Sequence, residues 1–144
     1  MGLIRSGMTD LTPEDDDQLT EFLWPVFREM IKTAVENRQN LILEGCYLPF
    51  DWRKDFTEDY LRNIHDFWLV MSSDYIRTHL DDIEAHGCDI ERRLENCCDP
   101  DLLIEENRKV LTGCEENGCS CILIDRSYPP NLAEQVLNQI TRQE

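Results

Sequence analysis

The fold is decided by the stretch Gln39-Asn40-Leu41-Ile42-Leu43-Glu44-Gly45-Cys46, residues 39–46. Three aliphatic residues stand in a row at its centre, and an acid and a glycine end the run. A short unbroken apolar run is typical of a parallel β-strand that is buried on both faces. In parallel sheets, ligands bind beyond the carboxyl ends of the strands, where Glu44 would lie. We therefore expect a strand at residues 40–45 that presents Glu44 to a binding site.

Two more apolar runs, at residues 67–71 and 121–125, predict further strands of the same kind. Helical patterns separate the three runs. Strands that alternate with helices predict crossover units and a parallel sheet. There are no internal repeats or linkers, so we expect one α/β domain that spans residues 1–144.

Helix boundaries are marked by residues with known capping roles. Thr12-Pro13-Glu14 predicts a helix start, and Pro25 within that helix predicts a kink or two abutting helices. A second helix is expected after Ser72 and up to Gly87. Asp99-Pro100 and Gly118 predict the start and the end of a third. A last helix follows the prolines at 129 and 130.

The net charge of -16 restricts the partners of the chain. Such an acidic protein is a poor ligand for nucleic-acid backbones and for anionic membranes. No apolar run approaches the ~20 residues that span a bilayer, and the N-terminus shows no secretory signal. We expect a cytoplasmic protein that binds neither nucleic acid nor membrane.

The chain contains an odd number of cysteines: Cys46, Cys88, Cys97, Cys98, Cys114, Cys119 and Cys121. An odd number without a secretory signal favours reduced thiols. Their spacing lacks the two CxxC-like pairs of a structural zinc site. Cys119 and Cys121 share one face of a predicted strand, and His86 and Cys88 are further possible ligands. Free thiols are the favoured interpretation, and no zinc is expected.

Four segments, taken in order, carry a family resemblance. Residues 40–52, 66–87, 90–93 and 119–128 read NLILEGCYLPFDW, DFWLVMSSDYIRTHLDDIEAHG, IERR and CSCILIDRSY. They resemble the later part of a P-loop kinase of the adenylate-kinase-like, small-molecule phosphotransferase group. The resemblance implies a P-loop NTPase fold, a three-layer parallel sheet with flanking helices. It also implies ATP and Mg²⁺ as cofactors and a small-molecule phosphoryl acceptor.

The chain departs from this family at its N-terminal end. Such kinases begin with a strand and GxxxxGK[ST], whose backbone amides and lysine hold phosphates. The 144 residues contain no such run. The resemblance thus implies that the family's first strand, phosphate loop and second strand are missing. A mis-assigned start codon, a shortened product or a degenerate paralogue would each produce this. A sheet without its central strand leaves two apolar edges that can pair directly, recruit another chain or aggregate. A homodimer through the exposed sheet edge is therefore one hypothesis.

The resemblance assigns roles to seven residues. Glu44 would be the catalytic acid that orients magnesium-bound water or activates the acceptor, with Asp51 as a second substrate-side carboxylate. Arg92 and Arg93 would stabilise charge on the transferred phosphoryl group. The remaining roles fall to Arg5, on the acceptor side, and to Asp125 and Arg126, in the purine-contacting loop.

Each of these residues also has a structural interpretation. Glu44 can be satisfied by a helix N-terminus, and Asp51 can be a solvated loop acid. Arg92 and Arg93 can pair with the neighbouring Glu91 and Glu95. The segment that follows residue 124 is rich in turn formers. The aromatic loop 46–56 can be a substrate lip, but a small buried cluster over the end of the sheet is favoured.

The leading interpretation is therefore an ATP-binding, kinase-like domain that is inactive alone because it lacks the phosphate loop. A second interpretation is a non-enzymatic scaffold that acts through oligomerisation or a protein partner. A third is a cysteine-based metal or redox protein, for which the spacing of the cysteines gives little support.

Overall fold

The structure is a computed structural model, and it describes residues 7–12, 15–87 and 98–140. Contacts between residues divide the chain into two compact units, Met1–Ile64 (unit 1) and His65–Glu144 (unit 2). The single domain over residues 1–144 stays a prediction.

Unit 1 is built on one long helix, α2 (Asp16–Glu36). It starts later than the motif at Thr12 predicts, because its N-cap residue is Asp15 and not Thr12. The backbone N–H and the hydroxyl of Thr12 both donate to the Asp15 carboxylate, at 2.9 and 3.0 Å. Pro25 lies inside α2 without dividing it, so of the two predicted alternatives the abutting helices are wrong and the kink stays a prediction. The helix ends at Glu36, Asn37 is its C-terminal cap, and Arg38 then adopts a positive φ of 53°.

The short helices η1 (Trp52–Asp55) and α3 (Glu58–Leu61) are joined to α2 by aromatic side chains. Trp24 of α2 meets Phe56 edge-on, with ring centroids 6.0 Å apart, and Trp52 meets Phe56 at 5.9 Å. Tyr60 donates a 2.5 Å hydrogen bond to Glu36 at the end of α2. These contacts hold the segment from 52 to 61 against the long helix.

The strand expected at residues 40–45 is not formed. The structure assigns no strand to this segment, and Ile42 is 94% exposed. The prediction was wrong because an apolar run becomes a strand only where a neighbouring strand accepts its backbone hydrogen bonds. The sheet of the described residues pairs only two strands, and both lie in unit 2.

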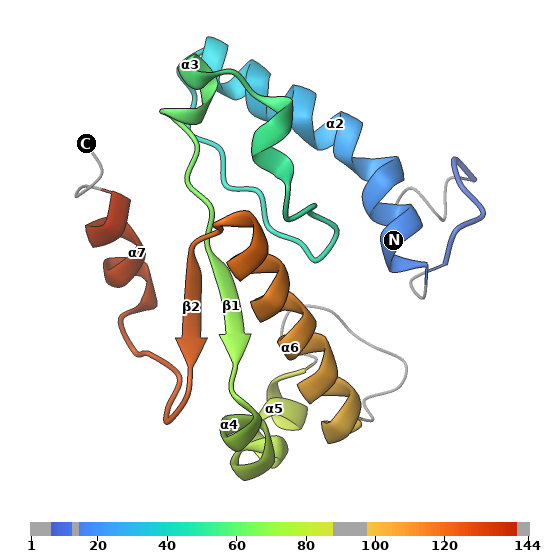
Figure 1. Ribbon diagram of the computed structural model, residues 1–144, viewed down its shortest axis with the longest axis vertical. Coiled ribbons are helices and arrows are strands. Elements are labelled where there is room, and N and C mark those ends of the chain that lie inside the picture. Colours follow the sequence, from blue (N-terminus) through green and yellow to red (C-terminus); the bar gives the residue numbers. More distant parts are fainter. Residues whose placement is uncertain (1–6, 13–14, 88–97, 141–144) are drawn as a thin grey trace. The chain divides into compact units, whose positions relative to one another are not determined.

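Unit 2 contains the two other predicted strands, β1 (Trp68–Met71) and β2 (Cys121–Ile124). They pair in parallel, with Trp68 opposite Cys121 and Met71 opposite Ile124, so both predictions are confirmed. The chain crosses between them through α4 (Ser73–Thr78), α5 (Leu80–His86) and α6 (Pro100–Asn117), and it continues into α7 (Leu132–Ile140) (Figure 1). The three-layer, P-loop-type sheet stays a prediction.

Helix α6 carries the clearest agreement with the sequence. The Asp99 carboxylate accepts from the amides of Asp101 and Leu102 at 2.9 and 3.3 Å, and Pro100 follows as the first helical residue. Gly118 ends the helix with a φ of 67°, a conformation that favours glycine. The segment from 73 to 86 differs from its prediction, because His79 divides it into α4 and α5.

The core of unit 2 lies between α6, α4 and one face of the strands. Its buried side chains come from these elements: Val70, Tyr75, Ile76, Ile104, Cys114, Ile122 and Ile124. The alternate strand residues Leu69 and Leu123 are 46% and 54% exposed. The strands therefore bury every second side chain, where an unbroken apolar run predicts burial on both faces.

A polar side chain of α6 completes the outer edge of β1. The amides of Trp68 and Ser72 donate to β2, at Ser120 and Ile124, so in a parallel ladder the Met71 amide faces the opposite edge. There it donates to the Asn107 side-chain oxygen at 2.8 Å. The Asn107 amide group donates in turn to Leu103 within the helix, at 2.9 Å.

We predict that Asn107→Ala destabilises the β1 edge while Asn117→Ala does not. Both asparagines donate to a carbonyl four residues earlier in α6, but only Asn107 also accepts from a strand. A strand amide without its partner costs about 1–3 kcal/mol, equal to at least a several-fold loss of protection. Amide hydrogen exchange at Met71 measures the effect. Equal losses in the two variants would show that the strand contact contributes nothing.

Candidate functional site

The carboxyl ends of β1 and β2 form the site that the topology favours. Met71 and Ile124 are register partners, so the residues that follow them, Ser72 and Asp125, leave the sheet at the same edge. The Ser72 amide donates to the Ile124 carbonyl at 2.9 Å, which extends the pairing by one residue. Ligands of parallel α/β proteins bind beyond this edge.

The Ser72 hydroxyl at this edge has a structural role. It accepts from the Tyr75 amide at 3.0 Å and so caps α4. Asp125 and Arg126 are exposed, and neither forms an ion pair within the part of the chain that the structure describes. An unpaired carboxylate and an unpaired guanidinium beside a strand end can hold a hydrated cation and an anion, respectively.

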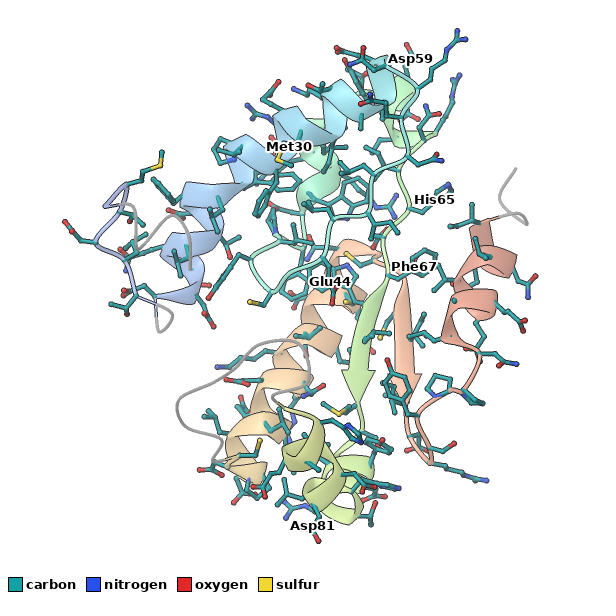
Figure 2. All side chains as sticks on the ribbon, turned by 180° about the vertical axis from the view of Figure 1, so that it is seen from behind. Met30, Glu44, Asp59, His65, Phe67 and Asp81 are labelled. Carbon is teal, nitrogen blue, oxygen red and sulfur yellow. The ribbon has the colours of Figure 1, made fainter. Side chains whose placement is uncertain are left out.

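The other predicted residues belong to unit 1 or lie outside the described residues. Glu44 and Asp51 belong to unit 1, where Glu44 is exposed on the loop that follows α2 (Figure 2). Asp51 forms an ion pair with Lys54, three residues later. Arg5, Arg92 and Arg93 lie outside the described residues. The structure thus brings Asp125 and Arg126 together, and it leaves Glu44 on a loop instead of a strand end.

Unit 1 has a groove that the sequence did not reveal. It encloses about 630 Å³ between α2 and the segment after it. Its lining residues are Pro25, Val26, Glu29, Met30, Thr33, Ala34, Gln39, Asn40 and Leu41. Met30 marks its position on α2 (Figure 2). The spacing of Val26 and Met30 on one helix face was the available signal.

The groove is lined by few ionisable side chains. Among the described residues that line it, the one titratable side chain is Glu29, which accepts hydrogen bonds from Arg28 and Lys32 at 2.9 and 3.1 Å. Both hydrogen bonds lower the pKa of Glu29 below its usual value. A carboxylate held ionised by two cations is a poor general acid. This groove is therefore suited to apolar contact and not to acid–base catalysis.

The aromatic loop is part of the core of unit 1 and not a lip. Trp52 is 5% exposed and Phe56 is also buried. The guanidinium of Arg53 lies 4.7 Å from the centroid of the Trp52 ring. The interpretation as a buried cluster is therefore the better one, although its expected place over a sheet end stays a prediction.

No protein-family model, curated protein or solved structure matches the chain. Among the described residues, no group of three or more His, Cys, Asp or Glu side chains is arranged to hold a metal ion. Within the same part of the chain, no helix is long and apolar enough to cross a membrane.

We predict that Asp55→Ala destabilises unit 1 and that Asp51→Ala leaves it nearly unchanged. Asp55 accepts a 2.7 Å hydrogen bond from the Trp24 indole, which its removal leaves unsatisfied in a half-buried place, at a cost of about 1–2 kcal/mol. The Asp51–Lys54 pair is exposed, and such pairs contribute about 0–1 kcal/mol.

Urea unfolding followed by tryptophan fluorescence compares the stability of the two variants. Asp55→Asn keeps an acceptor oxygen, so it should retain most of the stability that Asp55→Ala loses. A larger loss in Asp51→Ala than in Asp55→Ala would contradict the stabilising role given to the Trp24–Asp55 hydrogen bond.

Proposed function

We propose that the protein is a nucleotide-binding domain of the adenylate-kinase-like type that does not transfer phosphoryl groups by itself. In this proposal the carboxyl edge of β1 and β2 binds a magnesium nucleotide, ATP in the first place. The completed kinase would pass the γ-phosphoryl group to a small-molecule acceptor. The free thiols of the described cysteines favour a reducing compartment, so we assign the protein to the cytoplasm under the same proposal.

The observation that carries the proposal is the free Asp125–Arg126 pair at the end of a parallel strand. A carboxylate there suits the hydrated Mg²⁺ that accompanies a nucleotide. Arg126 suits one phosphate or a base edge. These two residues fit the outer part of a magnesium nucleotide and no more.

The phosphate loop for the transfer step is not present in the sequence. Phosphoryl transfer depends on backbone amides and a lysine that cradle the β- and γ-phosphates. The chain contains no GxxxxGK[ST] run. Glu44 lies on an exposed loop of unit 1, so we derive no catalytic step through it. Weak binding without turnover is the expected behaviour.

We predict that magnesium ATP shifts the amide resonances of residues 125–128 in an NMR titration of the full chain. Arg126→Ala should weaken the binding about tenfold, because a charge-assisted hydrogen bond contributes about 1.5–3 kcal/mol. Arg108→Ala is the matched control, since this exposed arginine of unit 2 is already paired with Glu105 at 2.7 Å. ATP hydrolysis should not exceed that of buffer.

Two results would overturn the proposal. One is an absence of shifts at residues 125–128 at the highest soluble nucleotide concentration. The other is an equal loss of affinity in Arg126→Ala and Arg108→Ala, which would assign the binding to general charge. Measurable phosphoryl transfer by the chain alone would contradict the inactive part of the proposal.

The outer edge of β2 favours a second candidate, a scaffold that forms a homodimer. Ser120 and Ile124 accept hydrogen bonds from β1, so the backbone groups of Cys121 and Leu123 face away from it. The described sheet has no strand on that side. The corresponding edge of β1 is already occupied at Met71 by Asn107. A second copy of the chain could therefore pair along β2.

We predict that a dimer, if it forms, is broken by Leu123→Lys and kept by Leu102→Lys. The two leucines are similarly exposed, at 54% and 57%, but only Leu123 lies on the open strand. A charge on an edge strand opposes pairing between copies. Sedimentation velocity at micromolar concentration measures the result, and a stable monomer of the unchanged protein at that concentration would reject the scaffold.

A further inference from the structure

Three of the described thiols gather where α6 passes into β2. Cys114 lies in the last turns of α6, Cys119 follows the helix stop, and Cys121 begins the strand. Cys114 is buried, Cys119 is half-buried and Cys121 is exposed. The three residues are free thiols, and neither the site at the strand ends nor the groove of unit 1 uses them.

The helix stop brings the first two thiols together. Gly118 and Cys119 both donate their backbone N–H groups to the Cys114 carbonyl, and the bond from Cys119 is 3.0 Å long. In helix stops of this kind, the residue after the left-handed glycine contacts the side chain of the residue that accepts its hydrogen bond. The Cys119 side chain accordingly contributes to raising the pKa of the Cys114 thiol, as expected of neighbouring thiols.

Strand alternation brings the third thiol to the same place. Residues two apart in an extended chain project to the same side, which aligns Cys121 with Cys119. The Cys114 side chain also acts on the pKa of Cys121, as expected of neighbouring thiols. Cys114 is therefore the central thiol, with one neighbour supplied by the helix stop and one by the strand.

We propose that the end of α6 is an oxidative modification site, at which Cys114 and Cys119 form an intramolecular disulfide under a low-molecular-weight disulfide such as glutathione disulfide. The proposal is independent of nucleotide binding. Cys119 is the expected partner of Cys114, because the hydrogen bond from the Cys119 amide to the Cys114 carbonyl holds these two residues close together. Cys121 belongs instead to the strand.

The reaction consists of two exchanges. The Cys119 thiolate attacks one sulfur of glutathione disulfide, which forms a mixed disulfide and releases one glutathione thiolate. The Cys114 thiolate then attacks the Cys119 sulfur and releases the second glutathione. The two protein thiols lose two protons and two electrons, and the oxidant is reduced to two glutathione molecules.

The second exchange is the slow one, because Cys114 is held in its neutral form. Burial raises the pKa of Cys114 to about 12, and Cys119, Cys121 and Asp66 oppose its negative charge further. Burial and Glu115 also raise the pKa of Cys121. Only the thiolate attacks. As long as the pH is below the pKa of Cys114, each increase of one pH unit should therefore raise the rate of disulfide closure about tenfold.

Peptide mass spectrometry tests the proposal on the full chain. The folded protein is treated with glutathione disulfide, quenched in acid, unfolded and alkylated. Trypsin releases residues 110–126, which contain these three cysteines, and cleavage after Glu116 separates Cys114 from the other two. The expected result is that the two halves stay joined by a disulfide and that Cys121 is alkylated.

Cys46 provides an internal control, because it is exposed and should retain the mixed disulfide with glutathione. In Cys121→Ala the disulfide should still form, and in Cys119→Ala it should be lost. The protein unfolded in concentrated guanidinium chloride should lose the preference for the pair 114–119. Three results would overturn the proposal: persistent glutathione on Cys119 beside an alkylated Cys114, a Cys114–Cys121 disulfide, or the same pairing in the unfolded chain.

Discussion

The structure of unit 2 depends on the parallel pairing of β1 with β2. Two short strands without further neighbours are marginally stable, so other groups must hold the pair. Asp66 holds its amino end: one carboxylate oxygen accepts from the Ser120 amide at 3.0 Å and from the Trp68 indole at 3.2 Å. Ser72 extends the pair at the carboxyl end, and Asn107 occupies the outer edge. The position of α6 against β1 follows from this arrangement.

The sequence predicted best those features whose cause is local. The start of α6 at Asp99-Pro100 and its end at Gly118 depend on residues that lie within a few positions of each other. The run at residues 40–45 had an equally clear apolar pattern, but a strand needs a distant partner and no sequence pattern supplies one. Asn107 was overlooked because it is polar. Its place between Leu103 and Leu111 on the apolar face of the helix was the available signal.

The same distinction applies to the candidate site. Asp125 and Arg126 could be placed from the sequence because they follow a strand that does form. Glu44 could not, because its assignment depended on a strand that does not form. The ion pair of Asp51 with Lys54 could have been anticipated from their spacing of three residues. A role that a family resemblance assigns to a residue therefore depends on the element that positions the residue.

The acidity of the chain limits how it could bind a phosphate compound. Among the described residues, six cations form ion pairs: Arg28, Lys32, Lys54, Arg62, Arg77 and Arg108. Arg126 is an exposed guanidinium beside the strand ends, and it faces a net charge of -16 over the chain. An isolated phosphate anion would therefore be repelled more strongly than one neutralised by a divalent cation. Under the proposed function, Mg²⁺ provides most of the attraction, and Arg126 determines where on the edge the nucleotide is held.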